Sequence, residues 1–166
     1  MSVANPAKAA LFGLHEAGAG GRRALILSLA RAANNLTPAE IRQLRRALFE
    51  EEGVSRDEAA ALFELDRAQN APCLEWTEFF VECLTDHLVW QVRPTGVLAQ
   101  EQAEWLIGEA GRKFSLSGFA LLANVLAESD RAPQWFLDEV RKRARAPAVQ
   151  AALAAAAAMN GELASA

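Results

Sequence analysis

Oxygen-bearing side chains are concentrated in the segment 66–78, and they are the residues of this chain best suited to chemistry. Asp66, Asn70, Glu75 and Glu78 supply carboxylate and amide oxygens within this segment. Such oxygens are the ligands that Ca²⁺ prefers, and the ion takes roughly six to eight of them. A loop that brings the four side chains together would hold a calcium ion. The sequence therefore offers these four residues as candidate metal ligands.

The spacing within this segment departs from a working calcium loop, which has about 12 residues and a glycine at its sixth position. Residues 66–78 make 13 positions, Ala71 stands where the glycine is needed, and Pro72 stiffens the turn. Ala68 supplies no side-chain oxygen where an interior ligand is expected. The alternative is therefore a corner between two helices that holds no ion.

The acidic residues are unevenly distributed, since residues 71–110 carry seven acids against the single base Arg93. Such a centre attracts a cation or a basic protein partner, and a solvated helix face is the alternative. The whole chain has a net charge of −4 and a pI near 5.3, which argues against nucleic-acid binding. The acids predicted to form a partner surface are Glu82, Asp86, Glu101 and Glu104.

The residues that most enzymes use are scarce in this chain. It has two histidines, His15 and His87, and it lacks a nucleophile elbow, an HExxH sequence and a Ser/His/Asp arrangement. The glycines at 17–21 do not follow a predicted strand, as a phosphate-binding loop must. Cys73 and Cys83 have no zinc-ligand spacing and are expected as reduced thiols. We therefore predict a non-catalytic protein whose only candidate cofactor is calcium. The alternative is an enzyme whose site is assembled from residues scattered along the sequence.

Helix signals dominate the elements that must position these residues. Strand-like alternation is missing, threonine is scarce, and alanine and leucine are abundant. Thr37-Pro38-Ala39-Glu40 and Ser55-Arg56-Asp57-Glu58 are capping boxes that start helices. The predicted fold class is all-α, a bundle of about seven short helices followed by an alanine-rich helix. We expect helices near residues 21–34, 38–52, 56–68, 75–91, 99–113, 117–129, 133–145 and 147–158.

The helix predicted over 75–91 carries part of the acidic surface and an aromatic stripe. The stripe is expected as the buried face of this helix, with His87 at its edge, and the lining of an aromatic groove is the alternative. The residues that share this face are Trp76, Phe80, Cys83, His87 and Trp90. The predicted core consists of Leu62, Phe63, Phe79, Phe80, Leu84, Leu88, Trp90, Leu106, Phe119, Leu122, Val125 and Phe136.

Helix starts recur along the chain at spacings of 18 to 23 residues, from Leu36-Thr37 to Leu116-Ser117. A period of this size is typical of paired helices that cannot bury their apolar faces alone. The segments LFELDRAQNAP at 62–72 and LAESDRAP at 126–133 also resemble each other, because both carry Asp-Arg-Ala ahead of a proline. We therefore expect the bundle to be arranged as helix-loop-helix pairs.

The segment 58–88 resembles an EF-hand, because its second helix opens with Leu74-Glu75-Trp76-Thr77-Glu78-Phe79, an apolar–acid–aromatic–x–Glu–Phe pattern. This resemblance implies that Asp66 begins the loop, that Asn70 is an interior ligand and that Glu78 closes the loop. GVSRDEA at 53–59 and GVLAQEQA at 96–103 are similar to helix starts of tellurite-resistance TerB-like domains. The second resemblance implies an all-helical repeat around the EF-hand-like corner.

Three regions are expected: a mobile arm over 1–20, one helical domain over 21–146, and an alanine-rich helix or tail over 147–166. No apolar run approaches the ~20 residues that span a bilayer, and no targeting segment is recognised. The predicted location is the cytoplasm. The predicted function is a helical interaction module for a protein partner, with a calcium sensor or buffer as the alternative. The oligomeric state is left open.

Overall fold

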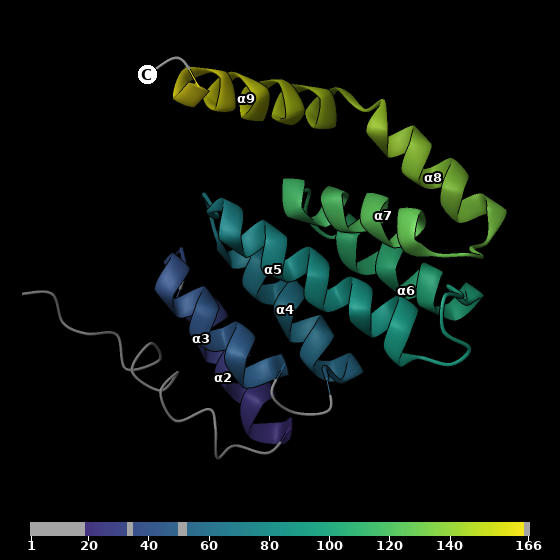
Figure 1. The fold of residues 1–166 in the computed structure, drawn as a ribbon, viewed down its shortest axis with the longest axis horizontal. Coiled ribbons are helices and arrows are strands. Elements are labelled where there is room, and N and C mark those ends of the chain that lie inside the picture. Colours follow the sequence, from purple (N-terminus) through teal and green to yellow (C-terminus); the bar gives the residue numbers. More distant parts are fainter. Residues whose placement is uncertain (1–18, 33–34, 50–52, 165–166) are drawn as a thin grey trace, which may run out of the picture.

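The computed structural model describes residues 19–32, 35–49 and 53–164. These residues form eight α-helices and one π-helical segment, with a single isolated bridge and no strand among them. The all-α prediction is therefore confirmed (Figure 1). In chain order the elements are α2 (Ala19–Arg31), α3 (Pro38–Phe49), α4 (Arg56–Ala68), α5 (Leu74–Thr85), η2 (Asp86–Gln91), α6 (Gln100–Gly111), α7 (Leu116–Glu128), α8 (Gln134–Ala144) and α9 (Pro147–Ala164).

The two predicted capping boxes are present at the starts of their helices. Ser55 Oγ accepts a hydrogen bond from the Glu58 amide, and the Glu58 carboxylate accepts from the Ser55 amide at 2.8 Å. Thr37 and Glu40 exchange the same two bonds ahead of α3. Each exchange satisfies two amides that a helix start leaves without partners. Local sequence therefore explains where α3 and α4 begin.

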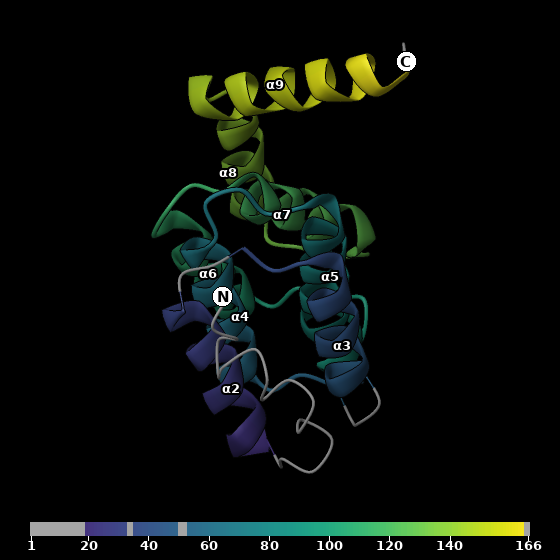
Figure 2. The same cartoon turned by 90° about the vertical axis from the view of Figure 1, so that its left-hand side faces the viewer.

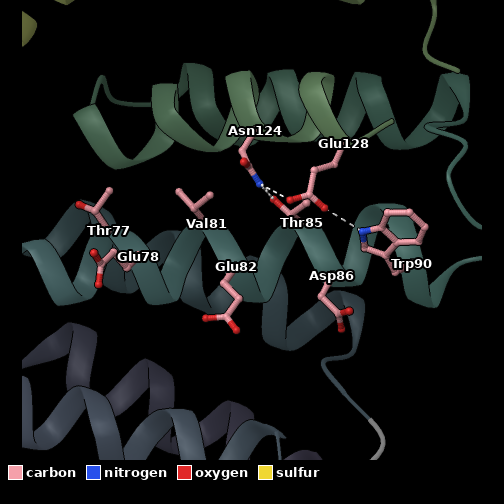
Figure 3. Close-up of a pocket in the computed structure, with 9 residues that line it drawn as sticks. All are labelled: Thr77, Glu78, Val81, Glu82, Thr85, Asp86, Trp90, Asn124 and Glu128. Carbon is pink, nitrogen blue, oxygen red and sulfur yellow. Dashed lines mark hydrogen bonds between the residues drawn. The ribbon is translucent and has the colours of Figure 1, made fainter. Parts of the chain in front are cut away.

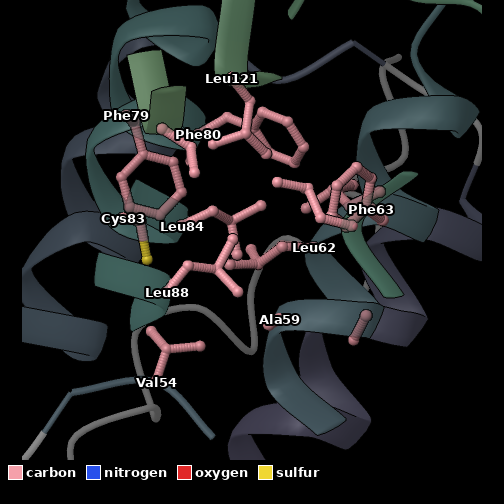
Figure 4. Close-up of a cluster of buried hydrophobic side chains, with 14 of the residues drawn as sticks. Val54, Ala59, Leu62, Phe63, Phe79, Phe80, Cys83, Leu84, Leu88 and Leu121 are labelled. Carbon is pink, nitrogen blue, oxygen red and sulfur yellow. The ribbon is translucent and has the colours of Figure 1, made fainter. Parts of the chain in front are cut away.

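Helices α4 and α5 hold the centre of the hydrophobic core. Figure 4 shows Phe63 on α4 facing the side chains of α5, with Leu121 of α7 closing the cluster. The rings of Phe63 and Phe80 meet edge to face with centroids 5.1 Å apart, a geometry that aromatic pairs favour. The predicted core residues are buried, except that Phe119 is half-buried and Trp90 is exposed.

The exposure of Trp90 follows from a change of helix type within the segment expected as one helix. The α-helix ends at Thr85 and continues as the π-helix η2. A π-helix bonds residue i to residue i+5, so each residue beyond Thr85 advances less around the axis than in an α-helix. His87 stays buried under this change, whereas Trp90 emerges with 45% of its surface exposed. The core prediction for Trp90 is therefore wrong.

The corners between helices meet in pairs through their loops. The loop after α2 contacts the loop after α4, where the Leu36 amide donates to Gln69 Oε1 at 3.0 Å. The loop before α6 contacts the loop after α7, where Val97 and Arg131 form a parallel bridge. These contacts agree with the expected helix-loop-helix pairs. Helix α7 packs against both α4 and α5.

The C-terminal helices lie at one end of the bundle. Figure 2 shows α8 leading away from α7 and α9 lying across the end of α8. Helix α9 runs six residues beyond the expected end at 158, in keeping with the high helix propensity of alanine. Leu153 and Met159 on this helix are exposed, at 42% and 68% of their surfaces.

The predicted arm over 1–20 lies outside the described residues, except for Ala19 and Gly20, which begin α2. His15 and most of the glycine segment 17–21 lie outside them as well. Within the part of the chain that the structure describes, every helix is too short or too polar to cross a membrane.

Candidate functional site

A groove with a volume of about 500 Å³ runs between the continuous helix α5–η2 and α7 (Figure 3). Four of its nine lining residues are carboxylates and none is basic, so we call it the acidic groove. Helices α5 and α7 pack directly on each other, and the packed centre of the bundle therefore supports both walls. The lining residues are Thr77, Glu78, Val81, Glu82, Thr85, Asp86, Trp90, Asn124 and Glu128.

One wall of the acidic groove consists of two parallel rows on the continuous helix α5–η2. The inner row includes Val81 and Thr85 and lies toward α7 in Figure 3. The outer row contains Glu78, Glu82 and Asp86, which follow one another at intervals of four residues. Like charges at this spacing on a helix repel by about 0.2–0.5 kcal/mol per pair. A cation beside the outer row would relieve this repulsion.

Trp90 closes one end of the acidic groove and is tied to the opposite wall. Its Nε1 donates to Glu128 Oε2 at 2.9 Å. Asn124 Nδ2 donates to Glu128 Oε1 at 3.3 Å and to Thr85 Oγ1 at 3.0 Å (Figure 3). These bonds connect η2 and α5 to α7 and hold the indole at the rim. The ring therefore offers a fixed and solvent-exposed aromatic surface.

The carboxylates of the outer row differ in their partners. Glu82 pairs with Arg45 of α3, and both of these side chains are exposed. Asp86 accepts a hydrogen bond from the side-chain amide of Gln91. Glu78 is exposed and has no ion pair with any described residue. An exposed ion pair such as Arg45–Glu82 is worth about 0–1 kcal/mol, so another cation can compete for Glu82.

The structure divides the predicted partner surface into two places. Glu82 and Asp86 line the acidic groove, whereas Glu101 and Glu104 lie exposed on α6 and do not line it. Sequence analysis missed Glu128, because it lies on α7 and no spacing in the chain links it to α5. The outer row was detectable, since three acids at four-residue intervals share one helix face.

Asp66, which was expected to begin a calcium loop, is instead buried with 3% of its surface exposed. Its carboxylate accepts hydrogen bonds from Trp76 Nε1 at 2.7 Å, Ser115 Oγ at 2.6 Å and Ser117 Oγ. These donors come from the start of α5 and the start of α7. The Asp66 side chain therefore joins three helices at the centre of the fold.

The remaining predicted calcium ligands lie on the surface. Asn70 is exposed in the loop after α4, and Glu75 and Glu78 are exposed on α5. Glu78 lines the acidic groove, whereas Asp66 and Asn70 line a different cavity. Among the described residues, no three His, Cys, Asp or Glu side chains are grouped as metal ligands. Calcium binding in this segment stays a prediction.

Two buried ionisable groups lie on the same continuous helix as the acidic groove but do not line it. Burial lowers the pKa of His87 below its ordinary value of 6.5, and no described residue offers a hydrogen bond to its Nδ1. Burial raises the pKa of Cys83 to about 12, with Asp86 and Glu82 adding to the effect. Both groups are therefore neutral at pH 7, and carboxylates alone give the groove its charge.

The acidic groove combines a carboxylate row, a partly apolar strip and an exposed indole between two packed helices. Such a combination can hold a positively charged side chain by ion pairing and by contact with the aromatic face. No protein-family model, curated protein or solved structure matches the chain, so the chemistry of the groove rests on its own residues.

Proposed function

We propose that the protein is a non-catalytic interaction module whose acidic groove binds a lysine- or arginine-bearing segment of a protein partner. The observation that carries this proposal is the lining, which contains four carboxylates and no basic residue. Partly apolar walls lower the local dielectric constant, which strengthens the attraction between these carboxylates and a cation. A basic segment would therefore be attracted at long range and held at short range.

The shape and composition of the acidic groove suit the two parts of a long basic side chain. Lysine and arginine carry an aliphatic stem that packs on apolar surface while the charged head stays in a polar setting. Val81 is partly exposed and offers apolar surface for the stem, whereas Thr85 is buried beneath it. Glu128 and Trp90 lie together at one end of the groove on the side of α7, where a carboxylate and an aromatic ring are available to the head, and Asp86 adds a further negative charge on the side away from α7.

The chain itself contains an arginine held in a comparable way at the edge of the groove. The Arg45 guanidinium pairs with Glu82 and lies 5.8 Å from the centre of the Phe79 ring. A carboxylate of the outer row and an aromatic ring thus hold a guanidinium together in the folded protein. This contact supports the proposal that the outer row accepts basic side chains.

The proposal is tested with a fluorescent peptide of alternating lysine and alanine, titrated with the full chain while anisotropy is recorded. A peptide with glutamate in place of lysine controls for non-specific association. The double variant Glu82→Lys/Asp86→Lys should weaken binding of the basic peptide by at least about tenfold, because two attractive charges become repulsive. Raising the salt concentration should weaken wild-type binding as well.

A matched control distinguishes the groove from the overall charge of the protein. Glu101→Lys/Glu104→Lys makes the same change in net charge on α6, outside the groove, and should alter the affinity by less than about twofold. Equal losses in both double variants would show diffuse attraction and refute a groove site. Trp90→Ala should weaken binding about threefold, the value of an exposed cation–π contact.

A further inference from the structure

A pocket of about 240 Å³ lies where the ends of α6 and α8 meet the starts of α7 and α9, and we call it the α7–α9 pocket. It has no lining residue in common with the acidic groove. Seven of its ten lining residues have apolar side chains. Ligand sites in proteins are typically concave and mostly apolar, with a few polar groups that orient the ligand. The α7–α9 pocket has this composition.

The apolar walls of the α7–α9 pocket come mainly from α7, from α9 and from the segment before α7. Leu122 on α7 and Val149 on α9 are buried, with 1% and 3% of their surfaces exposed. Phe119 is half-buried, whereas Phe114 lines the pocket with 47% of its surface exposed. An apolar ligand would remove part of this aromatic surface from water, which favours binding.

Arg143, near the end of α8, is the only charged residue among those that line the α7–α9 pocket. Its side chain is three-quarters buried, with 25% of its surface exposed. Its Nη2 lies 3.6 Å from the position that a Cβ on Gly111 would occupy, and Gly111 lines the pocket as well. The guanidinium is therefore part of the pocket wall.

The Arg143 guanidinium keeps one edge free. Its Nε donates to Glu139 Oε1 at 2.8 Å, while Nη1 and Nη2 donate to no acceptor among the described residues. Glu139 does not line the pocket and also pairs with Lys142, so two bases share one acid. Two parallel N–H groups of a guanidinium match the two oxygens of a carboxylate. The free edge can therefore bind a carboxylate.

The helix ends around the α7–α9 pocket do not set its preference for charge. The ends of α6 and α8 carry partial negative charge, and the starts of α7 and α9 carry partial positive charge. These contributions oppose each other, and none of the lining residues is acidic. Arg143 therefore determines the charge that a ligand in the pocket meets.

We propose that the α7–α9 pocket binds a small amphiphile that has a carboxylate head and a short apolar chain. The carboxylate accepts hydrogen bonds from the two Nη atoms of Arg143, and the chain packs on Phe119, Leu122 and Val149. The pocket is smaller than the sites of drug-sized ligands, which occupy about 300–1,000 Å³, so a chain of the size of octanoate suits it. This binding is separate from the acidic groove and does not depend on its function.

The experiment titrates the full chain with octanoate, below the concentration at which octanoate forms micelles. Carbon–proton correlation spectra follow the methyl groups of Leu122 and Val149, so that only binding at the pocket is recorded. Acetate tests the head without the chain, and octylammonium tests the same chain with the opposite charge. Octanoate should give a saturable shift, acetate should give none over the same range, and octylammonium should bind at least about tenfold more weakly than octanoate.

One pair of variants tests the guanidinium. Arg143→Gln should weaken octanoate binding about tenfold, because it removes charge-assisted hydrogen bonds, and it should not weaken octylammonium binding. Arg141→Gln makes the same change in net charge at an exposed position of α8 that does not line the pocket. It should change the affinity for octanoate by less than about twofold.

A second pair of variants tests the pocket itself. Ala148 lines the pocket and is exposed, so Ala148→Trp should fill part of the pocket and weaken octanoate binding at least about tenfold. Ala151 is exposed on the same helix but does not line the pocket. Ala151→Trp should therefore leave the affinity within about twofold of the wild-type value.

Three results would overturn the proposal: no saturable shift with octanoate, equal affinities for octanoate and octylammonium, or equal losses within either pair of variants. Melting curves of each variant establish that the fold is kept. If Arg143→Gln fails to fold without its bond to Glu139, the pair Ala148→Trp and Ala151→Trp still decides the matter, because both alanines are exposed.

Discussion

The two corners that contain the sequence Asp-Arg-Ala use it in different ways. In the α4–α5 corner, Asp66 lies within α4, two residues before its end at Ala68, and its buried carboxylate joins three helices. In the α7–α8 corner, Asp130 lies two residues beyond the end of α7 and is exposed. There the backbone makes the contact, since the Asp130 amide donates to the Gly96 carbonyl at 2.8 Å.

The arginines of the two corners show the same contrast between a side-chain contact and a backbone contact. Arg67 pairs with the buried Glu109, whereas Arg131 is exposed and contributes its backbone to the bridge with Val97. The position of a helix end therefore decides whether a tripeptide acts through its side chains or through its backbone. The α4–α5 corner should be sensitive to side-chain changes, and the α7–α8 corner should be sensitive to backbone changes.

The largest expected effect is the loss of the Asp66 carboxylate. Asp66→Ala should lower the free energy of unfolding by about 3 kcal/mol or more, because the buried indole of Trp76 and hydroxyl of Ser117 lose their acceptor. Asp130→Ala should lower it by about 0.5 kcal/mol or less, since no described side chain depends on this carboxylate. Urea unfolding followed by circular dichroism measures both values.

Asp66→Asn sharpens this comparison, because it keeps the size of the side chain and one acceptor oxygen. Its loss of stability should lie between those of the alanine variant and the wild type. Equal effects of Asp66→Ala and Asp130→Ala on the free energy of unfolding would contradict the distinction between the corners.

The second expected effect concerns the backbone of the loop between η2 and α6, which packs on the α7–α8 corner through the bond from the Asp130 amide to the Gly96 carbonyl. Gly96 has φ +77°, and an added Cβ would lie 2.6 Å from Asp130 Oδ2. The exposed carboxylate can move, but the positive φ cannot be relieved, so Gly96→Ala should cost about 1–2 kcal/mol. Gly108→Ala on α6 meets nothing within 4 Å and should stabilise the protein by about 0.5–1 kcal/mol.

Gly96→Ala should lower the free energy of unfolding, whereas Gly108→Ala should raise it. Because both variants introduce alanine, a general effect of alanine cannot produce the two opposite signs. The cost of Gly96→Ala should persist in the Asp130→Ala background, because the strain belongs to the backbone. A cost that disappears there would show that the side-chain contact, not the conformation, was responsible.

A smaller effect is expected from acid, through His87 in η2, which leads into the loop that packs on the α7–α8 corner. Burial is the main cause that lowers the pKa of His87 below 6.5 in the folded protein and Arg56 adds to it, while hydrogen bonds with Gln91 and Val54 and the charge of Asp86 oppose this. The unfolded chain therefore takes up the proton first, so stability falls as pH drops through 6.5 and continues to fall to the folded-state pKa. Each pKa unit by which the folded state lowers the pKa of His87 corresponds to a loss of about 1.4 kcal/mol in the free energy of unfolding at acid pH.

Urea unfolding of wild type and His87→Gln, between about pH 8 and pH 5, measures this contribution. The variant should have a flatter dependence of unfolding free energy on pH in this range. An unchanged slope in His87→Gln would assign the acid sensitivity to other groups. Hydrogen exchange measured over the same pH range compares the opening of the amides around Gly96 with that of the amides in the α4–α5 corner.

The smallest effect is one on reactivity rather than stability. Cys73 is half-buried in the α4–α5 corner, whereas Cys83 is buried and its pKa is raised to about 12. A disulfide reagent near pH 8 should therefore modify Cys73 in the folded protein and Cys83 only after unfolding. Cys73→Ser should abolish the native-state reaction.

This reaction also reports on the corner that contains Cys73. Asp66→Ala should accelerate the labelling of Cys73, because the α4–α5 corner opens more often, whereas Asp130→Ala should leave the rate unchanged. Rapid labelling of Cys83 in the folded wild type would contradict the burial of its thiol.

Much of the helical framework was predictable because its signals are local. The capping residues Ser55 and Glu58 lie within one turn of each other, and the outer row of acids on the continuous helix α5–η2 repeats every four residues. Patterns of this length fall within the reach of a single helix. The acidic groove was only half predictable for the same reason, since Glu128 comes from α7.

Sequence spacing was misleading where the local geometry changed. The α-helical periodicity that placed Trp90 in the core does not hold beyond Thr85, where the π-helix begins. Asp66 has the residue type of a calcium ligand, yet its position lets two serines from α7 reach its carboxylate. Neither the change to a π-helix nor the contact with α7 has a signature in the neighbouring residues.

The sequence by itself determined the all-α class, the starts of α3 and α4, and most of the core, because apolar periodicity and capping act over one or two turns. Only the tertiary structure decided which acids share a groove and which aspartate is buried. These properties depend on contacts between residues far apart in the chain, where no periodic pattern connects them.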